Sequence, residues 1–136
     1  MKQDIDSIQM INETYAVKVT VSPEMLASFM GSGTLDVLST PYLIALMENA
    51  ATQLAQNYID DDCTTVGTMI NIMHTAPTPL NAEIRAEATL TKIDGRFFYF
   101  DVAAFDELGE IANGKHERCS VKSQKFQEKA DSKIEK

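Results

Sequence analysis

One segment of the sequence, residues 40–58, has the length and the apolar pattern of a long helix. Thr40 and Pro41 form a start signal, a capping residue followed by a proline, and the acidic run DDDC ends the pattern near residue 60. On a helical wheel a broad apolar arc is formed by Leu43, Leu46, Met47, Ala50, Ala51, Leu54 and Tyr58. A helix with so wide an arc needs another layer to cover it, so we expect this segment to be buried.

The rest of the chain has the pattern of strands. Residues 14–22 alternate between polar and apolar side chains, which predicts a half-buried strand before the helix. Four more strands are expected after the helix, at residues 64–76, 82–93, 97–105 and 111–126. A proline-containing break and an Asp-Gly hairpin turn at 94–96 separate the first three of them.

This order predicts an α+β protein in which a curved antiparallel five-stranded sheet surrounds one long central helix. That is the pattern of the hotdog fold. We expect a single domain over residues 1–126, followed by a charged C-terminal tail at 127–136 that is either frayed or a solvated helix. One helix rarely covers a five-stranded sheet completely, so the remaining apolar surface predicts a homodimer.

Charge and composition exclude several classes of function. The chain carries 20 acidic and 12 basic residues, a net charge of -8, which disfavours nucleic-acid binding. No apolar run approaches the roughly 20 residues that a membrane span needs, and the first ten residues lack the apolar core of a secretory signal. Cys63 and Cys119 fit no CxxC motif, and we expect free thiols in a reducing cytoplasm in preference to one disulfide. His74 and His116 lie in different segments, so we expect no metal and no cofactor.

Two side chains stand out chemically. Glu48 lies at the edge of the apolar arc, and no basic residue in the segment 37–58 is available to pair with it. Partial loss of hydration would make its carboxylate a stronger base or nucleophile, although a boundary glutamate can also extend into water. His74 shares a strand face with aliphatic side chains, where it is either a structural histidine or a general acid and base.

Three further residues allow two interpretations each. Thr40 has a structural task as the helix N-cap, and a catalytic task only if a base lies beside it. Gly67 interrupts a strand, which indicates a bulge or the close approach of a ligand. Arg118 belongs to the triplet HER at 116–118, which is either a solvated strand edge or a site for a phosphate or carboxylate.

The spacing of these residues resembles that of the hotdog thioesterases of the fluoroacetyl-CoA thioesterase family. The resemblance covers about residues 35–126 and includes VLSTPYLIALMENA, TTVGTMINIMHTAPTP, the run from AEATLTKIDG to HER, and the closing KF. In that family a threonine precedes the central helix, a glutamate follows eight residues later, and a histidine lies twenty-six residues beyond. Thr40, Glu48 and His74 keep both spacings, and Gly67 matches the glycine seven residues before the histidine.

The resemblance implies an acyl-CoA thioesterase that hydrolyses a short-chain acyl-CoA to the free acid and coenzyme A. It implies Thr40, Glu48 and His74 as the catalytic set, with Gly67 and Arg118 in substrate binding. The phosphates of coenzyme A need cations, for which Arg118, Lys115, Arg85 and Arg96 are candidates.

One departure from the family concerns specificity. The fluoroacetate-detoxifying member has aromatic residues six and nine positions before the threonine, whereas this chain has Thr34 and Gly31. The departure favours a broader short-chain acyl-CoA hydrolase. The alternatives are a hotdog dehydratase or hydratase and a noncatalytic acyl-CoA binding module.

Helix geometry adds a constraint on the site. Eight residues of a helix span about 12 Å, so Thr40 and Glu48 cannot form a hydrogen bond if both lie on one straight helix. Thr40 must bend in from the loop, act through the substrate, or meet the glutamate of a second subunit. We expect two equivalent sites shared by two chains.

Overall fold

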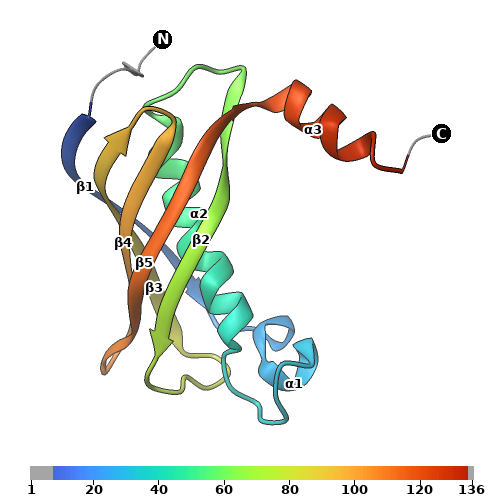
Figure 1. The fold of residues 1–136 in the computed structure, drawn as a ribbon. Helices are drawn as coiled ribbons and strands as arrows, with labels where there is room; N and C mark the ends of the chain where they lie inside the picture. The colour runs from blue at the N-terminus through green and yellow to red at the C-terminus, as the bar shows by residue number, and fades with distance from the viewer. Residues whose placement is uncertain (1–7, 135–136) are drawn as a thin grey trace.

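A five-stranded antiparallel sheet curves around one long helix in the computed structural model, which describes residues 8–134 (Figure 1). The spatial order of the strands is β1-β3-β4-β5-β2, and every neighbouring pair is antiparallel. The strands are β1 (Ile8–Thr20), β2 (Cys63–His74), β3 (Glu83–Asp94), β4 (Phe97–Asp106) and β5 (Gly109–Lys122). The α+β architecture predicted from the sequence is therefore confirmed. Residues 1–7 of the expected domain and 135–136 of the expected tail lie outside the described residues.

The central helix α2 (Thr40–Gln56) packs mainly on β3 and also contacts β1, β2 and β4. The residues that it buries are Leu43, Met47, Ala50, Ala51, Leu54 and Ala55. They meet alternate side chains of the sheet, including Ala86 and Ala88 of β3, which are 1% and 0% exposed. Small residues at these two positions let the helix approach the strand closely.

The segment that leads into α2 is fixed to the loop between β2 and β3. It follows two short helices, η1 (Pro23–Met25) and α1 (Ala27–Met30). The backbone N–H of Leu38 donates to the carbonyl of Thr78 at 2.8 Å. As a result, the N-terminus of α2 lies beside the C-terminal end of β2.

Three boundaries differ from the sequence-based expectation. The first strand begins at Ile8, earlier than expected, because the residues before Thr14 pair with the end of β3, where Ile8 lies opposite Asp94. The central helix ends at Gln56, before the acidic run. The last strand ends at Lys122, and a helix, α3 (Ser123–Asp131), follows and crosses the expected boundary between domain and tail.

Helix α3 leaves the end of β5 and projects beyond the edge of the sheet formed by β2 (Figure 1). None of its residues is buried. Within residues 8–134, no helix is long and apolar enough to cross a membrane.

Candidate active site

The side chains of Thr40 and His74 meet at the N-terminal end of α2. Thr40 is the first residue of that helix, and His74 is the last residue of β2. The Oγ1 atom of Thr40 lies 2.8 Å from Nδ1 of His74. A hydroxyl at this distance from an imidazole nitrogen can pass its proton to the ring or receive one from it.

Thr40 is not the N-cap of the helix, which corrects the structural interpretation of this residue. Ser39 is the N-cap, and its Oγ accepts a hydrogen bond from the backbone N–H of Tyr42 at 3.2 Å. Two adjacent hydroxyl residues precede Pro41, and the sequence did not show which of them caps the helix. Because Ser39 satisfies the helix end, the hydroxyl of Thr40 is available to His74.

The environment of His74 favours the neutral ring. Burial lowers the pKa of His74, and an interaction with the backbone of Ala76 opposes this in part. Within the described residues its Nε2 atom is buried and has no hydrogen-bond partner. Thr40 and His74 both line a cavity of about 290 Å³, together with Ser32 and the small residues Ala27 and Ala76. A small polar group could therefore reach the pair from this cavity.

Glu48 lies at the middle of α2, opposite Gly67 of β2. A methyl group placed on Gly67 would lie 3.1 Å from Oε2 of Glu48 and 3.5 Å from Nη1 of Arg118. The same methyl group would lie 3.5 Å from Cε1 of His116. The missing side chain of Gly67 thus leaves a space that a carboxylate, a guanidinium and an imidazole all border.

Arg118 is a buried cation that is held on three sides. Its Nε donates to Oγ1 of Thr65 at 2.8 Å, its Nη2 donates to the carbonyl of Thr65 at 2.8 Å, and its Nη1 lies 3.2 Å from Nε2 of His116. Burial lowers the pKa of Arg118, and the negative charge of Glu48 raises it. Glu48, which has no basic neighbour in its own segment, therefore receives one from β5.

His116 has one tautomer in this network. Its Nδ1 lies 2.8 Å from the carbonyl of Met69, which can only accept, so Nδ1 carries the proton. Its Nε2 faces Arg118, which can only donate, so Nε2 is unprotonated. Burial lowers the pKa of His116, in agreement with a neutral ring.

The triplet HER is therefore not a solvated strand edge. His116 is 1% exposed and Arg118 is 6% exposed, and both side chains face α2 beside the buried Phe98 and Phe100. Sequence reasoning missed His116 and Thr65 as partners of Arg118. Alternate residues of the last strand share one face, and this spacing was the available signal for placing His116 and Arg118 together.

The two groups of side chains lie apart within one chain. Eight residues of α2 separate Thr40 from Glu48, about 12 Å at 1.5 Å per residue. Seven residues of β2 separate Gly67 from His74, about 20 Å along the strand. In the part of the chain that the structure describes, no hydrogen bond joins Glu48 to Thr40 or His74.

The other candidate cations lie outside both groups. Arg85 pairs with Glu87 and stacks on the ring of Phe105. Lys115 pairs with Asp101. Arg96 lies in a separate groove beside α3. Among residues 8–134 no cluster of three histidine, cysteine or acidic side chains could hold a metal ion.

Comparison with known proteins identifies relatives of this chain among the thioesterases. The sequence profile of the fluoroacetyl-CoA-specific thioesterases matches residues 21–124. The fluoroacetyl-CoA thioesterase of Streptantibioticus cattleyicolor is 33% identical over 98 residues, which are 72% of this chain and 70% of that protein.

Solved structures agree in fold. A crystal structure of a fluoroacetyl-CoA thioesterase superposes with a TM-score of 0.87 at 26% identity, covering 93% of this chain and 98% of that one. A threonine-to-serine variant in complex with acetyl-CoA gives the same TM-score and identity, covering 93% and 100%.

Fold and site define a hotdog protein of the thioesterase class. The chain belongs to the family of fluoroacetyl-CoA-specific thioesterases.

The assignment of Ser39, and not Thr40, as the N-cap of α2 can be tested by measuring the stability of two variants. Ser39→Ala removes the cap of α2 and should lower the free energy of unfolding by about 1 kcal/mol. Thr40→Val keeps the cap and the shape of the side chain, so it should change stability by clearly less. Urea denaturation followed by circular dichroism measures both, and a larger loss in the valine variant would contradict the assignment.

Proposed function

We propose that this protein hydrolyses short-chain acyl-CoA thioesters to the free acid and coenzyme A. The observation that carries the proposal is the space beside Gly67, which is bordered by the carboxylate of Glu48 and the guanidinium of Arg118. A carboxylate beside a backbone without a side chain leaves room for a thioester carbonyl. Membership of the thioesterase family supports the same reaction.

Thioester hydrolysis makes three chemical demands. A nucleophile adds to the carbonyl carbon, negative charge develops on the carbonyl oxygen, and the C–S bond breaks as the thiolate leaves and receives a proton. A site for this reaction therefore needs a base or nucleophile, a positive or hydrogen-bonding group near the oxygen, and a proton source.

Glu48 is the proposed base or direct nucleophile. Glu48 is half-buried on α2 and is attracted by the positive charge of Arg118. Three hydrogen bonds hold the guanidinium of Arg118 in place. If Glu48 takes a proton from a water molecule, that water adds to the thioester carbonyl, the thiolate leaves, and the free acid forms directly. Attack by Glu48 itself gives an anhydride that water then hydrolyses.

Thr40 and His74 are the proposed proton-transfer pair. A neutral His74 can take the hydroxyl proton of Thr40 or deliver a proton to the leaving sulfur, depending on which nitrogen carries it. Thr40 then either positions the substrate or water by its hydroxyl, or attacks with help from the ring.

We propose that the site is shared between two copies of the chain in a homodimer. In one chain, about 12 Å of helix separates Thr40 from Glu48, too far for one carbonyl group to contact both. The β2 strand, which carries Gly67 and His74, is an edge strand of the sheet and exposes Met73 at 66%. Pairing of two such edges would bring Glu48 of one chain toward Thr40 and His74 of the other.

Fluoroacetyl specificity is not part of the proposal. Gly31 and Thr34 are both exposed and add no aromatic wall to the cavity beside Thr40. The cavity of about 290 Å³ suits a short acyl group. We place the enzyme in the cytoplasm, since both cysteines are free thiols, as expected in a reducing compartment.

The reaction is tested with a panel of acyl-CoA esters from two to eight carbons, with thiol release followed by absorbance. Turnover should be greatest among the shorter chains. Glu48→Gln and His74→Ala should each lower kcat by about 100-fold or more, because each removes an acid–base group from the site. Surface variant Lys18→Gln serves as the control and should retain full activity.

The outcomes separate the rival functions. Binding of acyl-CoA without thiol release would support a binding module instead. Hydration of an enoyl-CoA, detected as loss of its conjugated absorbance, would support a hydratase. Near-normal turnover of either site variant, with an unchanged circular dichroism spectrum, would remove that residue from the proposed set.

The pH profile follows from the burial of His74. Burial disfavours the charged ring, so the pKa is lowered from 6.5 and the neutral form persists below that pH. If His74 acts as a base, kcat/KM should remain on its plateau at pH 6.5 and fall only at lower pH. A fall that begins above pH 6.5 and is absent in His74→Ala would contradict the lowered pKa, and an acid limb that persists unchanged in His74→Ala would contradict the base role.

A further inference from the structure

A groove on the outer face of the sheet gathers positive charge on an otherwise acidic protein. It has a volume of about 470 Å³ and lies between α3 and the strands β2 and β5. Arg96, Lys122, Lys125 and Lys129 line it, and no acidic side chain does so among the described residues. Four of the chain's 12 basic residues thus share one groove, although acidic residues number 20. We call it the basic groove.

The basic groove is separate from the candidate active site. Its floor includes Val66 and Cys119, which lie opposite each other in the β2–β5 pairing. Their chain neighbours Gly67 and Arg118 face α2. Successive side chains of a strand point to opposite faces, so the groove lies on the other side of the sheet.

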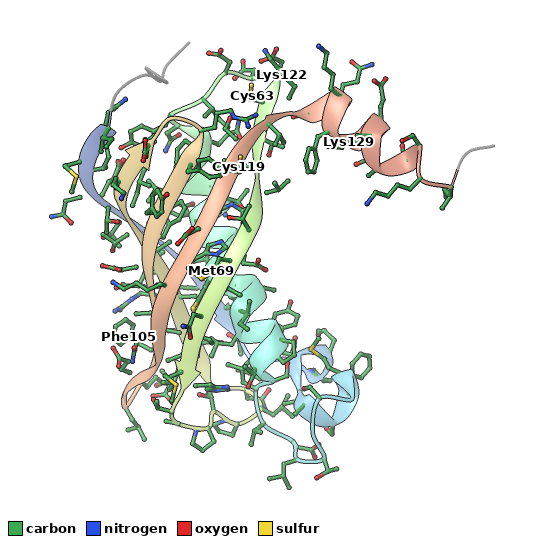
Figure 2. The ribbon with its side chains drawn as sticks, viewed as in Figure 1. Cys63, Met69, Phe105, Cys119, Lys122 and Lys129 are labelled. Atoms are coloured by element: carbon green, nitrogen blue, oxygen red, sulfur yellow. The ribbon has the colours of Figure 1, made fainter. Side chains whose placement is uncertain are left out.

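Helix α3 supplies one wall of the groove through the spacing of its sequence. Lys125 and Lys129 are four residues apart and Phe126 is three residues before Lys129, which places these side chains on one face of the helix. Lys122, the last residue of β5, lines the groove just before the helix begins. Figure 2 shows Lys122 at the end of β5, close to the start of α3, and Lys129 farther along α3.

Polar pairing turns the acidic side chains of α3 away from this wall. Two glutamines bind two carboxylates along the helix, in the pairs Gln124–Glu128 and Gln127–Asp131. Neither carboxylate lines the groove. The helix therefore separates its positive charges from its negative ones.

Three of the four cations have no counter-ion within residues 8–134. Lys122 pairs with Asp62 at 2.9 Å. Arg96, Lys125 and Lys129 form no ion pair with any residue between 8 and 134. Like charges gathered without partners repel one another, so an anionic ligand would relieve the repulsion.

The remaining lining is apolar and includes an aromatic ring. Phe126 is 42% exposed and borders the groove above Val66 and Val121. A planar base can stack on such a ring, while phosphates contact the cations around it. The volume falls in the range of small-molecule sites, which runs from about 300 to 1,000 Å³.

We propose that the basic groove binds a phosphorylated adenine nucleotide, with the adenine on Phe126 and the phosphates on Arg96, Lys125 and Lys129. The nucleotide has two conceivable sources. It is either the nucleotide end of an acyl-CoA or a free nucleotide that binds independently of the substrate. The chemistry of recognition is the same for both.

Binding is tested directly by isothermal titration calorimetry with adenosine 3′,5′-bisphosphate, which does not depend on the proposed hydrolysis. The wild-type chain should bind it, and the double variant Lys125→Gln/Lys129→Gln should bind about tenfold more weakly or worse. The control Lys18→Gln/Lys92→Gln removes the same charge outside the groove and should bind as wild type does. Phe126→Ala should weaken the binding of the bisphosphate but leave the binding of inorganic pyrophosphate unchanged.

A kinetic comparison then distinguishes the two sources. If the nucleotide belongs to the substrate, the groove variant raises KM for acyl-CoA but not for the matching N-acetylcysteamine thioester, which lacks a nucleotide. If a free nucleotide binds, both KM values stay unchanged while bisphosphate binding is lost. The proposal is overturned if the wild type does not bind the bisphosphate, or if the groove variant and the control variant bind it equally.

Discussion

The buried guanidinium of Arg118 is the interaction on which the candidate site depends. A charge with 6% of its surface exposed is tolerated only when its donors are satisfied, and here Thr65 and a neutral His116 satisfy them. This network fixes a positive charge on the inner face of the sheet, opposite the middle of α2. The carboxylate of Glu48 lies half-buried and interacts electrostatically with this charge.

A second constraint comes from the length of the central helix. Ser39 caps α2, which leaves Thr40 free to meet His74 at one end, whereas Glu48 lies two turns farther along. The rigid helix keeps the two groups of side chains apart in one chain. A symmetric partner could bring them together, and this makes the proposed dimer a part of the chemistry and not only a means of covering the sheet.

The fold was largely readable from the sequence because strand and helix periodicities are local. The central helix, the hairpins and the α+β class follow from them, as does the half-buried position of Glu48. Contacts between distant segments could not be predicted, because the approach of Arg118 to Glu48 depends on tertiary packing. The cap at Ser39 could not be predicted either, because two adjacent hydroxyl residues were equally suitable. The triplet HER was misjudged because charged residues are rarely buried. Residues 123–126 of α3 were expected in the last strand, and the rest in the charged tail as frayed chain or a solvated helix. Because α3 buries none of its residues, it has no wide apolar arc by which the sequence could distinguish these possibilities.

In the proposed dimer, one active site combines Glu48 of one chain with Thr40 and His74 of the other. Co-expression of a Glu48→Gln chain with a His74→Ala chain tests it most directly, because each mixed dimer would contain one intact site. With random pairing, half of the dimers are mixed, so thioesterase activity should recover to about one quarter of the wild-type value. Activity no higher than that of the two separate variants, with mixed dimers demonstrated by differential tags, would contradict the account.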